Sequence, residues 1–557
     1  MDINNMTLWI REDGIHNWLI ESEGGDFCNS YPKGTAGTEF TNGILWGGKV
    51  FDGNEKIIRV NGSDYSNGNS AITRLYRVRT DYFDADLTDD AANFFLVPQN
   101  QVNDSMITAI YKQYEKDWNE WPAEKGAPFY DVNKNGKYEP DIDVPGVPGA
   151  VQTLWINYRD STDVYRYLYG SPVIGLEIKE TYWAYAYTGI LGNVIYKKVD
   201  IIYKGTSETL PNSRIDSMYI VQWSDTDDGS PFDDFLGCDT SLNLGYTYNS
   251  KDSDLVYSKF LPAPPAFGYS ILNAAAYKTG NFSDSAIIDF IWKHGYKYFN
   301  SKPMTLFIAH RVAGDVVLPE YYYQGALQYY NIMRGYEPYP PYPYQRLFLR
   351  YSQFGGPLGG YGTYMLDGDP VTKQGWIDGI MDPPSSRSMY VISGPLNMKL
   401  GDTVEVAYAI VGGLGDTHLS SITNLKYNTK GAIEEYYNLV DDITSGKYAP
   451  KIQRPVSNLN PQNYILFQNY PNPFNSSTVI KYELPDDSHV TLVIYDILGR
   501  VVKTLVDAEK SPGKYKVKFE TDNLSSGIYF CKISFNNSKS KLIYDNLTRV
   551  NKLLLLK

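Results

Sequence analysis

Alternating apolar and polar residues run through most of the first 446 residues and predict strands. Two such runs, at 44–50 and 56–60, flank an Asp-Gly-Asn sequence that is typical of a β-hairpin turn. The runs at 174–187 and 194–203 are separated by a short Gly-rich stretch, which predicts antiparallel neighbours rather than a βαβ unit. The pattern predicts a large antiparallel β-rich region folded as a sandwich.

Three stretches have apolar residues spaced by three and four positions, which is the helical period. They lie at 104–118, 319–334 and 420–437. Asp104 is placed to cap the first of them, and Pro122 lies just past its end. We therefore expect a few helices within the β-rich region.

The C-terminal residues alternate more regularly than the rest and predict six or seven short strands over 464–557. Such strands, separated by turn sequences, are typical of an Ig-like β-sandwich. The stretch 447–463 is rich in Pro, Asn, Ser and Gln, and it is interpreted as a linker. The predicted fold is therefore mainly β, with a β-rich region at 1–446, a linker at 447–463 and an Ig-like sandwich at 464–557.

Four short sequences mark this last region: QNYPNPFN at 468–475, IYDILGR at 494–500, SGIYF at 526–530 and a Lys-ended apolar tail at 551–557. Together they closely resemble the type A C-terminal sorting domain of proteins exported by the type IX secretion system of Gram-negative bacteria. The resemblance implies that the outer-membrane translocon recognises residues 464–557. It also implies cleavage or anchoring at the surface, and so an extracellular or outer-membrane-surface location.

The rest of the chain gives a weaker indication of its family. The GCDTSLNLGY segment and the 393–426 region loosely resemble uncharacterised regions that precede such sorting domains, and that resemblance implies no activity. A type IX substrate is expected to carry an export signal, but residues 1–5 lack the basic start and apolar core of one. We therefore expect that the numbering begins at a processed or truncated start.

Composition narrows the class of protein. The 557 residues exceed what one core usually supports, so more than one domain is expected. The net charge of -13 argues against nucleic acid as a partner. No apolar run approaches the ~18 residues of a transmembrane helix. The number of Tyr residues, 50, is unusually high, and it suits solvent-exposed β-surfaces or faces that contact carbohydrate or a partner.

One loop has the spacing of the first half of a calcium-binding loop. Side-chain oxygens at positions 1, 3 and 5 precede a Gly at position 6, but position 12 is Ile142 rather than a bidentate carboxylate. A one-residue slip lets Asp143 take that place. The candidate calcium ligands are Asp131, Asn133, Asn135, Lys137, Glu139 and Asp143. A plain Asn/Gly/Asp turn is the alternative.

The densest chemical feature is an acidic stretch at 224–239, after a predicted strand. Six carboxylates within it repel one another unless a cation or the donors of a loop neutralise them. Its candidate metal ligands are Asp225, Asp227, Asp228, Asp233 and Asp234. Two interpretations stay open: a divalent-ion or ligand site, with calcium as the ion, and a solvated loop whose Asp residues cap turns.

No catalytic motif is present in the sequence. The five His residues form no HExxH-type pair, and there is no GxSxG or Walker A sequence. Carboxylates placed by the fold can still catalyse glycoside hydrolysis. The sequence favours a structural or adhesive protein that assembles into an extracellular layer or filament, with copies of itself or surface glycans as partners. The alternative is a secreted hydrolase that acts on polysaccharide or protein.

Overall fold

A computed structural model describes the following residues: 1–14, 16, 29–63, 69–160, 170–187, 189–311, 322–346, 349–351, 357–361, 363–380, 383–448, 465–469, 471–484, 487–511, 513–521, 524–536 and 546–556. The chain divides into two compact units, Met1–Ile452 and Gln453–Lys557. The predicted linker at 447–463 lies outside the described residues, except for Lys447 and Tyr448.

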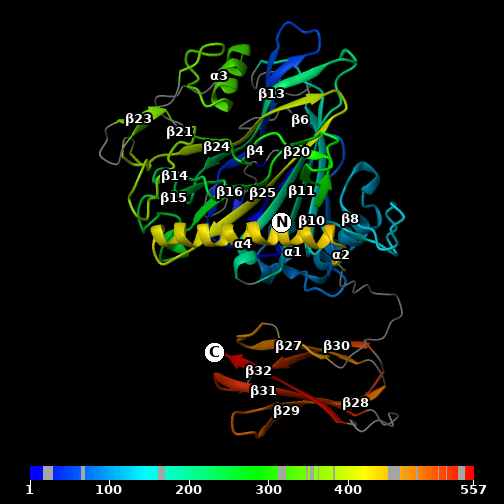
Figure 1. Cartoon of the computed structure of the whole chain (residues 1–557). Coiled ribbons are helices and arrows are strands. Elements are labelled where there is room, and N and C mark those ends of the chain that lie inside the picture. The colour runs from blue at the N-terminus through cyan, green and yellow to red at the C-terminus, as the bar shows by residue number, and fades with distance from the viewer. Residues whose placement is uncertain are drawn as a thin grey trace. The chain divides into compact units, whose positions relative to one another are not determined.

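Two antiparallel sheets form the body of the first unit (Figure 1). The nine-stranded sheet runs, in spatial order, β14 (Asp234–Asp239), β15 (Leu244–Asn249), β16 (Ala266–Asn273), β25 (Thr403–Gly413), β12 (Val194–Tyr203), β11 (Leu176–Ala184), β10 (Gln152–Asp160) and β6 (Asn69–Ala71), with β7 (Tyr76–Arg79) also paired to β10. The five-stranded sheet runs β21 (Leu306–Arg311), β24 (Arg387–Lys399), β13 (Arg214–Thr226), β4 (Thr41–Phe51) and β5 (Ile58–Gly62). The predicted antiparallel β fold is confirmed.

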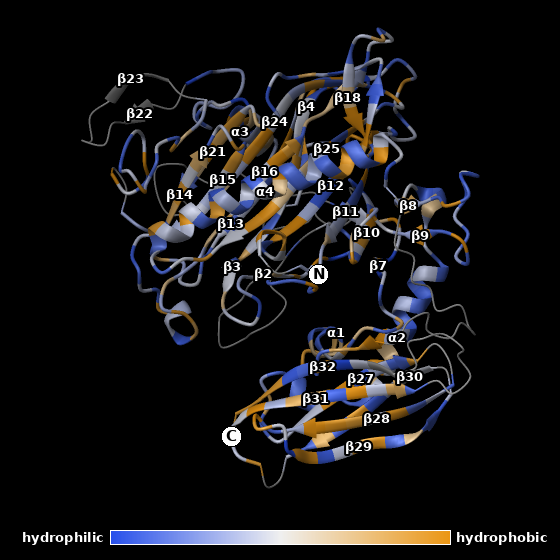
Figure 2. Cartoon of the chain, turned by 60° about the horizontal axis from the view of Figure 1, so that its bottom comes forward, coloured by the Kyte–Doolittle hydropathy of each residue, from blue (hydrophilic) through white to orange (hydrophobic). Residues whose placement is uncertain are grey.

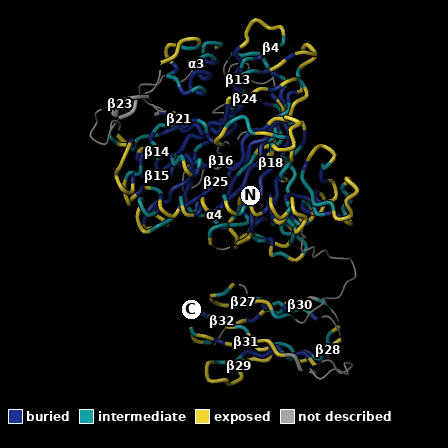
Figure 3. The backbone as a smooth tube through the Cα atoms, in the orientation of Figure 1, coloured by how far each residue is buried: buried dark blue, intermediate teal, exposed yellow. Residues whose placement is uncertain are grey.

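The two sheets pack face to face, and a helix covers the outer face of each. The main core contains side chains of both sheets, such as Trp46 and Ile220 from one and Ile156 and Val199 from the other. Helix α4 (His418–Thr444) packs on the outer face of the nine-stranded sheet and lies across its strands (Figure 1). Helix α3 (Tyr323–Met333) packs on the outer face of the five-stranded sheet. Because both faces of both sheets are covered, the strands are buried along most of their length (Figure 3).

Two of the helices begin at side chains that satisfy their free backbone N–H groups. Helix α2 (Asp104–Asn119) is capped by Asn103, whose side chain accepts hydrogen bonds from two backbone N–H groups, so the cap lies one residue before the predicted Asp104. Helix α4 begins at a capping box that pairs Thr417 with Ser420, and it extends beyond the predicted 420–437 at both ends. Helix α1 (Thr88–Phe95) packs beside α2.

Shorter elements complete the first unit. The short strands are β1 (Thr7–Leu8), β2 (Asn29–Ser30), β3 (Gly37–Glu39), β8 (Phe129–Tyr130), β9 (Val144–Pro145), β17 (Ala276–Lys278), β18 (Ser285–Ile288), β19 (Ile291–His294), β20 (Tyr296–Tyr298), β22 (Leu349–Tyr351) and β23 (Pro357–Tyr361). Four short 3₁₀ helices are described as well: Gln99–Gln101, Ala123–Lys125, Ile190–Asn193 and Tyr257–Lys259.

The second unit is a two-sheet sandwich, as predicted. Its sheets are β26 (Ile465–Leu466), β27 (Ser477–Leu484) and β30 (Gly513–Glu520), and β29 (Val501–Lys510), β28 (Ser488–Tyr495), β31 (Gly527–Asn536) and β32 (Asn546–Leu555). Hydrophobic and hydrophilic residues alternate along these strands (Figure 2). The inward residues, among them Ile480, Leu492 and Ile533, form one core.

The QNYPNPFN sequence fastens the last strand of this sandwich. The Asn472 amide donates to the carbonyl of Lys552 at 3.2 Å, and its side-chain oxygen accepts from the Leu554 N–H at 2.8 Å. The backbone of Phe474 bonds to Leu554 and Leu556. The predicted turn before the first strand therefore also holds the Lys-ended tail, which contains the last residues of β32.

Many of the tyrosines are found in the core, where the sequence had predicted surface strands. The largest fully buried side chains include Tyr114, Tyr158, Tyr182, Tyr196, Tyr203, Tyr246 and Tyr257. Four layers of secondary structure leave few solvent-facing strand positions. The tyrosine rings fill core volume, and some of their hydroxyls bond to buried polar groups, as those of Tyr158 and Tyr182 do to Glu180.

Charged side chains lie between the two sheets. Lys197 of β12 and Glu180 of β11 form an ion pair at 3.3 Å, and their side chains are 1% and 0% exposed. Glu180 also accepts hydrogen bonds from the hydroxyls of Tyr158, at 2.6 Å, and Tyr182. The Lys197 ammonium donates to Gln222 of β13, in the facing sheet, at 3.3 Å. This network therefore joins the two sheets through charge-assisted hydrogen bonds.

A second buried carboxylate, Glu39 at the end of β3, makes a similar connection. It accepts hydrogen bonds from Tyr269 of the nine-stranded sheet at 2.8 Å and from Ser224 and Asn42 of the five-stranded sheet. Asn29 donates to it as well, at 2.5 Å. Burial raises the pKa of Glu39 to about 7, although these hydrogen bonds oppose the shift.

Replacing Lys197 by Met is expected to lower the free energy of unfolding by about 3–5 kcal/mol, because Glu180 would stay buried without its cation. The double variant Lys197→Met/Glu180→Gln should regain most of that loss. The Lys204 side chain is 57% exposed and pairs with Glu177 at 3.9 Å. Lys204→Met should therefore lower the free energy of unfolding by less than about 1 kcal/mol. Chemical denaturation measures all three, and equal losses for Lys197→Met and Lys204→Met would contradict the prediction.

Glu39 is expected to make the stability of the protein depend on pH. Its pKa is higher in the folded chain than in the unfolded chain, so its contribution is complete below about pH 4.5 and is lost as the pH rises through about 7. The difference in unfolding free energy between the parent and Glu39→Gln should fall by about 3 kcal/mol between pH 4.5 and 8. Denaturant titrations across this range measure it, and a constant difference would show that Glu39 does not titrate there.

Candidate functional site

The Asp131 loop is closed by its own hydrogen bonds. The Asp131 carboxylate accepts from the backbone N–H groups of Asn135 and Gly136, at 3.2 and 2.6 Å. The amides of Asn133 and Asn135 donate to Glu139 at 2.7 and 2.5 Å.

The buried Asp143 carboxylate accepts from the N–H groups of Val132 and Glu139. Lys137 donates its N–H to the side chain of Asn135 at 2.8 Å. The arrangement is that of a well-formed Asx-rich turn, and calcium binding by this loop stays a prediction.

Most carboxylates of the acidic stretch are buried, contrary to the solvated loop that the sequence left open. It begins in the last residues of β13 and continues into β14. Asp225 is 5% exposed and accepts a hydrogen bond from Ser388 at 3.4 Å. Asp227, which is half-buried, accepts from Ser386 at 3.5 Å. These two carboxylates therefore face β24 and the loop before it.

The next three carboxylates of this stretch lie together. The Asp228 N–H donates to Asp234 at 3.2 Å, and the Asn249 amide donates to the carbonyl of Asp228 at 2.8 Å. Asp234 and Asn249 are direct partners in the antiparallel pair of β14 with β15. Asp233, next to them in the chain, forms an ion pair with Lys251 at 3.2 Å. We refer to Asp228, Asp233, Asp234 and Asn249 as the acidic cluster.

Burial and mutual repulsion shift the pKa values in this region upward. Burial raises the pKa of Asp234 well above its usual value, and the charge of Asp228 adds to the shift. Burial likewise raises the pKa of Asp228, with a further contribution from Asp254. The pKa of Asp227 is raised to about 6, again by burial. Each carboxylate is costly to ionise in this setting unless a positive charge joins it.

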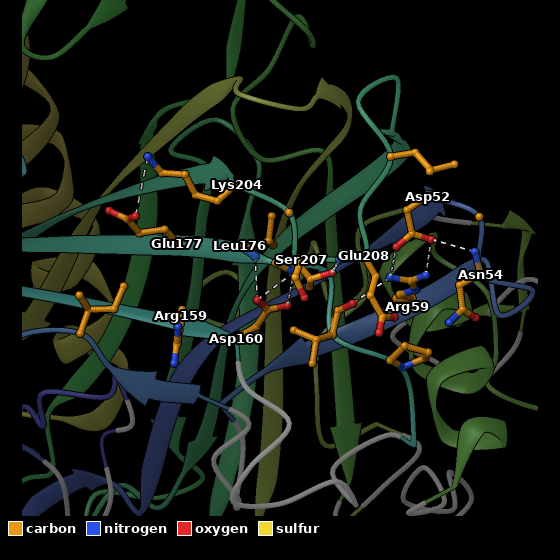
Figure 4. Close-up of a pocket in the computed structure, with 18 residues that line it drawn as sticks. Asp52, Asn54, Arg59, Arg159, Asp160, Leu176, Glu177, Lys204, Ser207 and Glu208 are labelled. Carbon is orange, nitrogen blue, oxygen red and sulfur yellow. Dashed lines mark hydrogen bonds and ion pairs between the residues drawn. The ribbon is translucent and has the colours of Figure 1, made fainter.

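A recess in the first unit lies at the end of β10, β11 and β12, with a volume of about 990 Å³ (Figure 4). Its wall includes the turn between β4 and β5, the end of β10, the start of β11 and the loop after β12. The recess is lined by positive and by negative side chains, those of Arg159, Lys204, Glu177 and Glu208.

Two polar groups fix the wall of this recess. The Arg59 guanidinium is 1% exposed and donates to both oxygens of Asp52, at 2.8 and 2.6 Å, and to the carbonyl of Val173. The Asp160 carboxylate accepts from three consecutive backbone N–H groups, those of Ile174, Gly175 and Leu176. Burial raises the pKa of Asp160 to about 6, and the three N–H groups oppose that shift. The recess is therefore built from rigid, paired groups.

Sequence reasoning found part of these sites and missed the rest. It identified Asp228, Asp233 and Asp234 because carboxylates are dense at that point of the chain. It missed Asn249, which strand pairing alone brings to them. It also missed the recess, because no local pattern connects residues drawn from several separate segments.

Comparison with known families identifies the second unit. Residues 468–544 match the family described as "Secretion system C-terminal sorting domain". The predicted recognition is confirmed: this unit is a type IX sorting domain, and the chain is a substrate of that secretion system. Such a substrate is exported to the cell surface or the extracellular space and interacts with the secretion system through its sorting domain. No helix among the described residues has both the length and the apolarity to cross a membrane.

Comparison with solved structures adds little for the first unit. The chain is similar to "Polysaccharide Lyase BACCELL_00875", with 6% identity and a TM-score of 0.19 over 69% of this chain and 36% of that one. It is also similar to dimeric latent PorU from Porphyromonas gingivalis, with 9% identity and a TM-score of 0.15 over 72% of this chain and 31% of that one. The chain thus spans about a third of each, and likenesses this low carry no argument. A search of the curated proteins found no match.

Deletion of residues 464–557 is expected to keep the protein in the periplasm of a bacterium that has the type IX system, because the sorting domain is what the translocon recognises. Cell fractionation and surface labelling measure the location. The matched control is Lys430→Ala, an exposed position on α4, which should reach the surface like the parent. Surface display of the truncated chain would contradict the prediction.

Proposed function

We propose that the protein is an adhesive cell-surface or secreted protein whose first unit binds a surface glycan in the recess beside Arg159 and Lys204. The observation that supports the proposal is the rigid mixed-charge wall of this recess. Sugar hydroxyls both donate and accept hydrogen bonds, so they pair with the carboxylates of Glu177 and Glu208 as well as with the two cations. A volume of about 990 Å³ is large enough for a short oligosaccharide.

The bonding of the recess favours binding over hydrolysis. Glycoside hydrolysis needs one carboxylic acid that is free to donate a proton and a second carboxylate across the bond. Asp160 is committed to three backbone N–H groups, and Glu177 lies within 3.7 and 3.9 Å of Lys179 and Lys204. Groups held in this way position a ligand more readily than they transfer protons.

The division of the chain into two units suits delivery followed by attachment. The sorting domain is a compact unit of its own, so the first unit keeps its fold whether or not the sorting domain is removed after export. A binding unit that is presented in this way would attach the cell, or the released protein, to glycan-bearing surfaces. Assembly of copies into a layer or filament is the second form of this structural role.

Arg159→Ala and Lys204→Ala are each expected to weaken glycan binding about 10- to 100-fold, because each variant loses one charge-assisted hydrogen bond to the glycan. A microarray of bacterial and host polysaccharides identifies the ligand, and calorimetry on the best glycan measures the two variants. Lys430→Ala is the matched control, since this exposed lysine does not line the recess.

Two results would contradict this function, and a third would select its second form. Absence of binding to any glycan would remove the adhesive role of the recess. Release of shortened oligosaccharides from a bound polysaccharide would indicate the hydrolase instead. Light scattering that shows concentration-dependent growth of the protein without glycan would favour self-assembly.

A further inference from the structure

Four oxygen atoms of the acidic cluster are buried and lack a hydrogen-bond partner. They are the Oδ1 atoms of Asp228, Asp233, Asp234 and Asn249. Three of these residues are 0% exposed, and Asp233 is 7% exposed. Buried polar atoms are almost always paired, and leaving one unpaired costs about 1–3 kcal/mol. Four such oxygens on residues that are neighbours in the chain or across a strand pair call for a ligand that supplies positive charge.

Three of these residues, Asp228, Asp234 and Asn249, already contact one another, and Asp233 precedes Asp234 in the chain. Hydrogen bonds join Asp228 to Asp234 and to Asn249, and strand pairing places Asp234 opposite Asn249. Asn249 is the independent sign of a ligand: it is uncharged and fully buried, and its amide lies against Asp228 with its oxygen unpaired.

Protein cations do not balance the charge of the cluster. Lys251 pairs with Asp233 alone, and its side chain is 55% exposed. The other acidic neighbour, Asp254, uses its carboxylate to accept from the N–H groups of Ser230, Val256 and Tyr257. No ion pair joins Asp228 or Asp234 to a basic residue in the described part of the chain.

We propose that the acidic cluster binds one calcium ion, with Asp228, Asp233, Asp234 and the side-chain oxygen of Asn249 as its protein ligands. The ligand set consists of oxygen alone, which suits a hard cation, and Ca²⁺ accepts six to eight such ligands in flexible geometry. Zn²⁺ prefers nitrogen and sulfur. Mg²⁺ requires a near-ideal octahedron and keeps several waters.

The ion draws the carboxylates together. Within the described residues, no three His, Cys, Asp or Glu side chains are already placed to hold a metal. Binding therefore turns the three carboxylates toward Asn249, starting from groups that hydrogen bonds already join. Asp225, bonded to Ser388, and Asp227, bonded to Ser386, stay outside the site.

The position of the ion gives it a structural effect. Asp228 follows β13 of the five-stranded sheet, whereas Asp234 and Asn249 belong to β14 and β15 at the edge of the nine-stranded sheet. A bound ion would therefore clamp one sheet to the edge of the other. Extracellular modules bind Ca²⁺ with dissociation constants of about 10⁻⁴–10⁻³ M, so the clamp would close outside the cell.

The test compares the full chain with Asp234→Asn, and with Asp131→Asn as the control in the other candidate loop. Tm is measured in EDTA, in Ca²⁺ and in Mg²⁺, and Ca²⁺ affinity is measured by calorimetry. The parent should gain Tm with Ca²⁺ and little with Mg²⁺. Asp234→Asn should weaken Ca²⁺ binding about 10-fold or more and lose the Tm gain. In EDTA this variant should be at least as stable as the parent, because it removes a like charge.

The outcomes separate the acidic cluster from its rivals. Asp131→Asn should keep the Ca²⁺ response; loss of the response there and not in Asp234→Asn would overturn the proposal in favour of the Asp131 loop. A parent whose Tm is the same in EDTA and Ca²⁺ would also overturn it, since the carboxyls would then be neutralised by protons. Should Asp234→Asn not fold, Asp233→Asn at the rim of the cluster replaces it with the same expectations.

Discussion

The first unit depends on burying charge between two sheets. Lys197, Glu180 and Gln222 connect the nine-stranded sheet to the five-stranded sheet, and Glu39 connects them again. Ions removed from water are stable only when each one finds its partner. A slip of one sheet over the other would leave these groups unpaired, whereas the apolar core around them tolerates small shifts. The polar network therefore fixes the register in which the sheets pack.

Both candidate sites lie where this packing ends. The recess lies at the end of β10, β11 and β12, where the loops leave the sheet, and its wall is held by Arg59 and Asp160. The acidic cluster lies where the chain passes from β13 in one sheet to β14 in the other. The proposed glycan site and the proposed ion clamp are separate, and each proposal can fail without the other.

The sorting domain shows why a short motif can carry so much information. In QNYPNPFN, Asn472 bonds the backbone of the last strand on both sides, and Phe474 pairs with it. The motif at the start of the domain and the tail at its end therefore form one structural feature. Their physical connection explains why sequence features some eighty residues apart identify one domain.

The sequence by itself determined the antiparallel β class, the approximate helices and the sorting domain, because these rest on periodicity and on local motifs. It located the carboxylates of the acidic cluster, since they are neighbours in the chain. Only the tertiary structure decided that these carboxylates are buried, that Asn249 joins them and that distant segments build the recess. It also decided that many tyrosines lie in the core, although the sequence predicted them on the surface. The physical reason is that burial depends on what covers each face of a sheet, and side chains on different strands meet only through pairing and packing that local patterns do not encode.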